Sequence, residues 1–171
     1  MGADVNDGQP RGQIIGAISI RKCPAKVEDQ AIPGHWDGDL LSGSKNSHIA
    51  TLVERHSRFV SVVQSLITQM RMLPERLRKS LTWDRGQELA AHKRFTMATN
   101  MAVYFCDPSS PWQRGTNENT NGLLRQYFPK GTGMGAYTQS QLNDVAEKLN
   151  SRPRKTLDFR TPAQVLDQAL H

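Results

Sequence analysis

The sequence has few cysteines, no long apolar run and no internal repeat. Its two cysteines, Cys23 and Cys106, lie far apart and form no CxxC pair. This argues against a cysteine-based zinc site and favours a reducing compartment. No run of 18 apolar residues exists, so no transmembrane helix is expected, and the N-terminus lacks the apolar core of a signal peptide. These absences predict a cytoplasmic protein without a membrane partner.

The composition is that of a globular protein with a basic surface. The 171 residues suffice for one domain with a real core, and 37% are hydrophobic and 22% charged. The net charge is +6 and the pI about 9.6, which suits a polyanionic partner. Residues 1–60 are balanced, with 7 basic and 7 acidic side chains, so the excess lies downstream of Val60. A solvated basic surface without a partner is the alternative interpretation.

Two regions are expected along the chain. Residues 1–31 are poorly periodic and are interpreted as a tail or linker, whereas residues 32–171 form the predicted domain. β-branched and alternating patterns predict five strands, and the last is expected to be buried on both faces. The strands are expected at residues 35–41, 48–57, 58–64, 80–86 and 101–107.

Helical periodicity predicts the remaining elements. Helices are expected at residues 65–80, 87–100, from 116 onwards, at 138–152 and at 161–170. Thr161 followed by Pro162 is a strong helix start, whereas Pro74 must kink or break the helix in which it lies. The order of the elements predicts an α/β fold whose mixed five-stranded sheet is antiparallel at first and parallel later.

Three carboxylates are placed at element ends in this layout. Asp39 lies in the first strand, Asp84 at the end of the fourth, and Glu118 in the first turn of the following helix. Ligands of open α/β sheets gather beyond the carboxyl ends of the strands. Carboxylates that meet there repel one another unless cations join them, and Mg²⁺ prefers oxygen ligands. Each acid also has a structural interpretation as a turn, cap or first-turn residue.

Four stretches carry a resemblance to a known family. They are "HWDGDL", "LTWDRGQE", "SPWQRGTNENTNGLLRQYFPKGT" and "LNSRPRKTLDFRTPAQVL", and they place Glu118 34 positions after Asp84. Over about residues 14–168 the chain resembles the catalytic domain of bacterial DDE transposases of the insertion-sequence-thirty group, relatives of retroviral integrase.

The resemblance implies an RNase H-like fold and a magnesium- or manganese-dependent enzyme with two ions that cuts and joins DNA strands at transposon ends. It assigns the catalytic and metal-binding triad to Asp39, Asp84 and Glu118, with Asp37 as the nearby alternative. It also implies DNA at transposon ends and targets as the partner, an active homo-oligomer, and a nucleoid-associated location in bacteria.

Polar and basic residues around Glu118 and near the C-terminus are predicted to contact DNA. Arginine and lysine side chains bind phosphates, and neutral amides can face DNA without adding negative charge. Capping and loop bonding is the alternative role for the asparagines, and Trp112 fits either base stacking or packing. The predicted DNA-binding set is Arg114, Asn117, Asn121, Arg125, Lys130, Arg152, Arg154 and Lys155.

The chain departs from the family pattern at two places. Relatives carry an N-terminal helix-turn-helix region, and nothing before Asp39 is long enough to hold one, which predicts a catalytic core or the product of a truncated gene. The segment from Val60 to Ser80 is about a dozen residues short for a third strand and a covering helix. We therefore expect a paired strand around Phe59 to Val63 and a short helix that breaks near Pro74. The alternatives to an active transposase are an inactive remnant that binds DNA and a stand-alone RNase H-like nuclease.

Overall fold

A computed structural model of the chain describes residues 32–83, 92–105 and 115–171. For residues 46, 92–94 and 115–118 it describes the backbone alone. The predicted tail, residues 1–31, lies outside these ranges, and the domain boundary stays a prediction.

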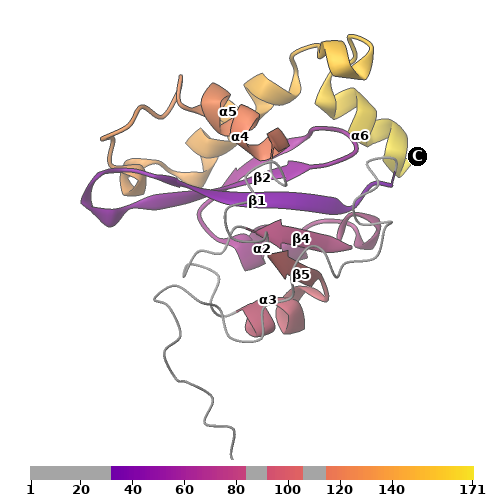
Figure 1. Cartoon of the computed structure of the whole chain (residues 1–171), viewed down its shortest axis with the longest axis horizontal. Coiled ribbons are helices and arrows are strands. Elements are labelled where there is room, and N and C mark those ends of the chain that lie inside the picture. Colours follow the sequence, from indigo (N-terminus) through magenta and orange to yellow (C-terminus); the bar gives the residue numbers. More distant parts are fainter. Residues whose placement is uncertain (1–31, 84–91, 106–114) are drawn as a thin grey trace, which may run out of the picture.

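One mixed sheet of five strands organises the described ranges (Figure 1). The strands follow the order β3-β2-β1-β4-β5 across the sheet. β1, β2 and β3 pair antiparallel, and β4 and β5 join β1 through parallel pairing. This is the predicted topology. The strands are β1 His35–Ser42, β2 His48–Glu54, β3 Val60–Val63, β4 Ser80–Trp83 and β5 Ala102–Phe105.

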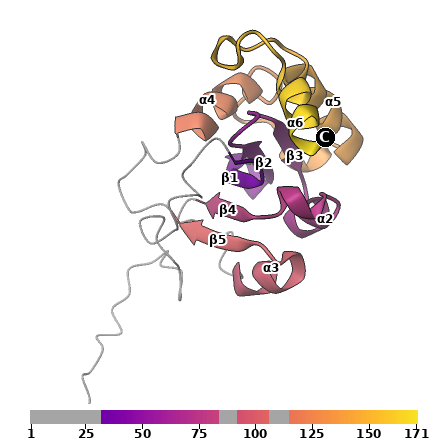
Figure 2. The same cartoon turned by 90° about the vertical axis from the view of Figure 1, so that its right-hand side faces the viewer.

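Helices cover both faces of this sheet (Figure 2). One layer consists of α2 Leu66–Arg71 and α3 His92–Thr99, and the other of α4 Gly115–Leu124, α5 Gln139–Asn150 and α6 Pro162–Leu170. Strand alternation separates two cores. Trp36 of β1 packs in the core on the α2–α3 side, whereas Leu41 of the same strand packs against residues of α4 and α5.

The predicted end strand departs from its expected burial. β5 is not buried on both faces, because Ala102 is exposed and Tyr104 half-buried, whereas Val103 and Phe105 are buried. The reason is its position at the edge of the sheet that the described residues form, in which β4 is its one partner. An apolar run of this length did not distinguish a central strand from an edge strand.

The shortened segment folds as predicted. β3 pairs with β2 from Val60 to Val63, opposite Val53 to Ala50. α2 has only 6 residues and ends at Arg71. A single 3-10 turn, Glu75–Leu77, follows Pro74 and leads to β4. The break at Pro74 follows from its missing N–H and fixed φ.

Side-chain amides of α5 cover the free edge of β3. Val60 N donates to Asn150 Oδ1 at 2.7 Å, and Asn150 Nδ2 donates to Val60 O at 2.8 Å. Gln139 Nε2 donates to Val62 O at 2.9 Å. Asn150 is 4% exposed, so these bonds are shielded from water. α5 therefore satisfies edge groups that would otherwise invite another strand.

Close packing fixes the end of β4 beside β1. Gly38 pairs with Trp83, and a Cβ atom at Gly38 would lie 2.2 Å from Trp83 Cε3. Only glycine lets the buried indole lie this close to the backbone. The last residue of β4 is thereby held next to the residue that precedes Asp39. No helix in the described part of the chain is long and apolar enough to cross a membrane.

Candidate active site

Asp39 lies in β1 on the side of the sheet that α4 and α5 cover. Its side chain is half-buried. Oδ1 accepts the Leu40 N–H at 2.8 Å, and Oδ2 accepts from Asn121 Nδ2 at 3.0 Å. Both carboxylate oxygens are therefore oriented by hydrogen bonds.

Asn121 joins Asp39 to α4. Its Oδ1 accepts from Thr51 Oγ1 at 2.9 Å, while its Nδ2 donates to Asp39. Thr51 Oγ1 also lies 3.3 Å from the carbonyl oxygen of Asp39. The structure gives the Asn121 amide two partners inside the protein. The DNA contact that the sequence predicted for Asn121 stays a prediction. The spacing from Glu118 was a usable signal, because residues three apart share a helix face.

α4 carries Glu118 one turn before Asn121. The bond between Asn121 and Asp39 therefore docks the Glu118-bearing helix against the strand that carries the first predicted acid. The Glu118 side chain and all of Asp84 lie outside what the structure describes. Asp84 directly follows Trp83, whose register partner Gly38 precedes Asp39.

Asp37, the alternative to Asp39, has a charged partner. Arg55 Nη2 lies 2.8 Å from Asp37 Oδ1, and Arg55 Nε donates to the same oxygen at 2.9 Å. The two side chains are 5% and 8% exposed. Arg55 Nη2 also donates to Thr82 Oγ1 at 3.4 Å. A buried carboxylate that already has a cation bound to it is a poorer metal ligand than Asp39, so we retain Asp39 as the candidate.

The described side chains supply only part of a metal site. Among them, no group of three or more histidine, cysteine, aspartate or glutamate side chains gathers to hold a metal. Asp84 and the Glu118 side chain lie outside the described part of the chain, so the triad stays a prediction. Asp39 by itself fits Mg²⁺ or Mn²⁺, because it offers hard oxygen donors at a partly exposed position.

The predicted DNA-binding residues divide into anchored and exposed side chains. Arg125 donates to Ser42 O at 3.1 Å and to Phe128 O at 3.4 Å, which fastens the end of α4 to β1. Arg154 is half-buried and donates to Leu149 O at 3.4 Å. Lys130 and Lys155 are exposed. Arg114 and the side chain of Asn117 lie outside the described part.

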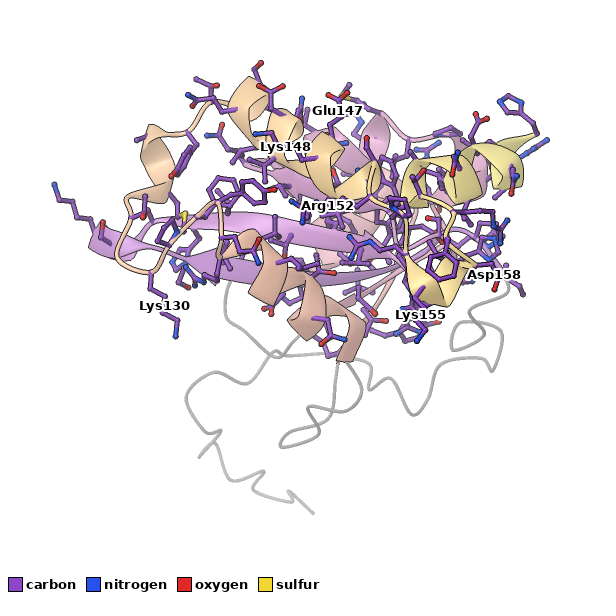
Figure 3. The ribbon with its side chains drawn as sticks, turned by 90° about the horizontal axis from the view of Figure 1, so that it is seen from above. Lys130, Glu147, Lys148, Arg152, Lys155 and Asp158 are labelled. Carbon is purple, nitrogen blue, oxygen red and sulfur yellow. The ribbon has the colours of Figure 1, made fainter. Side chains whose placement is uncertain are left out.

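Arg152 lies in an exposed aromatic–basic cluster. Its guanidinium carbon lies 5.9 Å from the Tyr127 ring centroid, and Lys148 Nζ lies 5.5 Å from the same centroid. Arg152 Nη2 also donates to the Tyr127 hydroxyl. Figure 3 shows Lys130, Lys148, Arg152 and Lys155 on the side of the sheet that α4, α5 and α6 cover, with Glu147 and Asp158 among them. This surface therefore carries both signs of charge.

Relatives among known proteins are transposases. The chain is 54% identical over 168 residues to the transposase of insertion sequence element IS30A from Escherichia coli, covering 92% of this chain and 44% of that protein. It is 49% identical over 172 residues to the transposase of insertion sequence element IS1086 from Cupriavidus metallidurans, covering 94% and 51%. The chain is a homologue of the IS30 transposases. It spans about half the length of these relatives, and no family model matches it.

Solved structures show the same fold at low identity. A simian T-cell lymphotropic virus intasome in complex with a PP2A regulatory subunit matches with a TM-score of 0.55 and 20% identity, over 78% of this chain and 54% of that chain. The catalytic core domain of BIV integrase matches with a TM-score of 0.53 and 18% identity, over 78% and 93%. This chain thus has the RNase H-like fold of integrase catalytic cores, as the sequence predicted.

The relatives also bear on the shortened segment. The match to the IS30A transposase spans 168 residues, whereas 92% of 171 residues is about 157, so about 11 positions lack a counterpart here. The IS1086 match gives the same difference, since 94% of 171 is about 161 against 172. This shortfall has the size that the sequence predicted between Val60 and Ser80.

Proposed function

We propose that this chain is the catalytic core of a DNA transposase that cleaves DNA strands and transfers them to a target. The observation that carries the proposal is the bond between Asn121 and Asp39, which docks the Glu118-bearing helix against β1. The proposed triad is Asp39, Asp84 and Glu118. Homology to transposases over 92% of the chain supports the assignment.

In the proposed reaction, an oxygen of water or of a DNA 3′-hydroxyl forms a bond to phosphorus as the bond to the leaving oxygen breaks. Asp39, Asp84 and Glu118 would hold two Mg²⁺ or Mn²⁺ ions, which stabilise charge on both oxygens when bound. Asn121 orients Asp39 by donating to Oδ2, and Thr51 fixes Asn121 in turn. This arrangement keeps Asp39 in place without adding another charge.

DNA is the proposed substrate and partner. The exposed cations Lys130, Arg152 and Lys155 lie on the side of the sheet that also carries Asp39, and we infer that they bind phosphates. We also propose DNA contacts for Arg114, Asn117, Arg125 and Arg154. We further propose that the protein assembles as a homo-oligomer on transposon ends and target DNA and acts at the bacterial nucleoid. If these residues bind phosphates, the affinity of the protein for DNA should fall steeply as the salt concentration rises.

A second candidate is a remnant that binds DNA without cutting it. The short α2 and the roughly 11 missing positions favour this alternative. The two candidates differ in metal-dependent chemistry rather than in binding.

Strand cleavage separates these candidates. Purified protein is incubated with labelled duplexes ending in the sequence of its own element, and with supercoiled plasmid, in Mg²⁺, Mn²⁺ or EDTA. Cleavage that needs the metal and is lost in Asp39→Asn supports the transposase core. Salt-dependent binding without cleavage in either metal supports the remnant. Cleavage of the plasmid without any joined product supports a nuclease.

A further inference from the structure

A polar pocket lies between three segments that are distant in sequence. It measures about 170 Å³, more than ten times the roughly 10–15 Å³ that one water needs. The β2–β3 turn, one flank of α4 and the connection between α5 and α6 form its walls. Its lining residues are Arg58, Asn119, Thr120, Leu123, Arg154 and Thr156.

The two arginines of this pocket are held by rigid backbone. Arg58 N donates to Glu54 O at 2.8 Å, and its φ of 63° fixes it in the tight turn. Arg154 N donates to Arg160 O at 3.0 Å, and the Arg154 carbonyl accepts from Leu157 N and Phe159 N. Two guanidinium groups from separate loops therefore line one pocket at fixed backbone positions.

Arg154 lacks a negative partner among the described residues. Its Nε is buried without a hydrogen-bond acceptor, and its Nη2 makes only the long bond to Leu149 O. Burial lowers the pKa of the Arg154 guanidinium from its ordinary value, and the charge of Arg152 lowers that pKa further. Within the described part of the chain no carboxylate lines the pocket. An anion in the pocket would supply the missing negative charge beside the Arg154 guanidinium.

The pocket and Asp39 lie on opposite flanks of α4. Residues two apart on a helix are about 200° apart around its axis, so Asn119 faces away from Asn121, which contacts Asp39. A helix is about 10 Å across, so a phosphate in the pocket would lie on the order of one helix diameter from a phosphate at Asp39.

We infer that this pocket is a phosphate subsite that holds a backbone phosphodiester of DNA beside the reacting one. Arg58 and Arg154 supply planar guanidinium donors that match phosphate oxygens, and Asn119 and Thr156 add neutral polar groups. The inference rests on the proposed function for the identity of the ligand. It adds Arg58, Asn119 and Thr156 to the predicted DNA-binding residues.

Two measurements on Arg58→Gln test the subsite. Inorganic phosphate is titrated while the ¹⁵N resonance of Arg154 Nε is followed, and the salt dependence of duplex DNA binding is measured. We expect a saturable shift of the Arg154 resonance in the wild type and its loss in the variant. The slope of log affinity against log salt should become shallower by about one. Arg71→Gln removes one exposed charge from α2 on the opposite face and should change neither readout.

Asn119→Asp keeps the test decisive if Arg58→Gln fails to fold. Asn119 is exposed on α4, so the new carboxylate should repel phosphate without disturbing the core. Asn119→Asp, and Arg58→Gln where it folds, are each compared with the control Arg71→Gln. If either variant gave the same phosphate shift and the same salt slope as Arg71→Gln, the subsite would be overturned. Loss of the phosphate shift with an unchanged DNA slope would overturn the assignment to DNA. If the wild-type protein showed no metal-dependent cleavage, the proposed catalysis would be refuted. The result of the phosphate titration would still hold.

Discussion

The α4–α6 layer and the α2–α3 layer cover opposite faces of one sheet with different lengths of helix. α4, α5 and α6 have 10, 12 and 9 residues, whereas α2 and α3 have 6 and 8. The long layer contacts Asp39, and the exposed cations Lys130, Arg152 and Lys155 lie on its side of the sheet. The short layer includes α2, which lies in the Val60–Ser80 segment that the sequence predicts to be shortened. The comparison teaches that short helices can cover one face of the sheet while longer helices on the other face hold Asp39.

Helix ends show the same difference between the layers. α5 begins with a complete capping box, in which Gln141 N donates to Thr138 Oγ1 and Thr138 N donates to Gln141 Oε1. α6 repeats it with Thr161 and Gln164. Ser65, the N-cap residue of α2, makes no side-chain cap bond. Short helices depend on caps and packing because nucleation is costly, so α2 is the weaker helix.

Asp39→Asn should have the largest effect on strand cleavage. The amide keeps the shape of the carboxylate but loses the charge proposed to bind the metal, together with one of the two oxygens that accept from Leu40 N and Asn121 Nδ2. Metal ions stabilise transition states by several kcal/mol, so cleavage should fall by about 100-fold or more. Asp144→Asn, on the exposed face of α5, is the matched control and should cleave normally. Equal cleavage by both variants would refute the role of Asp39.

Asn150→Ala should have the largest effect on stability within the long layer. The change leaves the N–H and C=O of Val60 without their partner at a buried position. Each unsatisfied group costs about 1–3 kcal/mol, so denaturant unfolding should show a loss in that range or above. Asp144→Ala removes an exposed side chain from the same helix and should cost far less. Similar losses in both variants would show that α5 does not close the edge of β3.

Much of this architecture follows from local pattern, and the rest depends on distant contacts. Strand alternation, the Thr161 cap and the break at Pro74 act within a few residues, and the sequence predicted all three. The contacts of Asn121 with Asp39 and of Asn150 with Val60 join residues 82 and 90 positions apart. The spacing from Glu118 places Asn121 on the helix face of that acid, but no local pattern identifies a partner so far along the chain. The sequence therefore predicted only a DNA contact for Asn121 and no role for Asn150.

Hydrogen exchange should rank the two layers directly. Amides of α2, Leu66–Arg71, should exchange at least about tenfold faster than those of the buried turns of α5, which corresponds to about 1.4 kcal/mol in opening free energy. They should also exchange faster than those of β5, Ala102–Phe105. Equal and strong protection of α2 and β5 would contradict the interpretation of the Val60–Ser80 segment as weakened.

Helix caps provide the smallest and most local test of the comparison. Thr138→Ala removes the oxygen that accepts from Gln141 N at 3.2 Å, and loss of such a cap typically costs about 0.5–2 kcal/mol. Ser65→Ala at the start of α2 removes a hydroxyl that bonds only to the exposed Thr68 Oγ1 and caps no backbone group. Its cost should stay below about 0.5 kcal/mol, as for ordinary surface changes. Thermal unfolding of both variants measures the difference, and a larger loss for Ser65→Ala would show that α2 is anchored at its N-terminus after all.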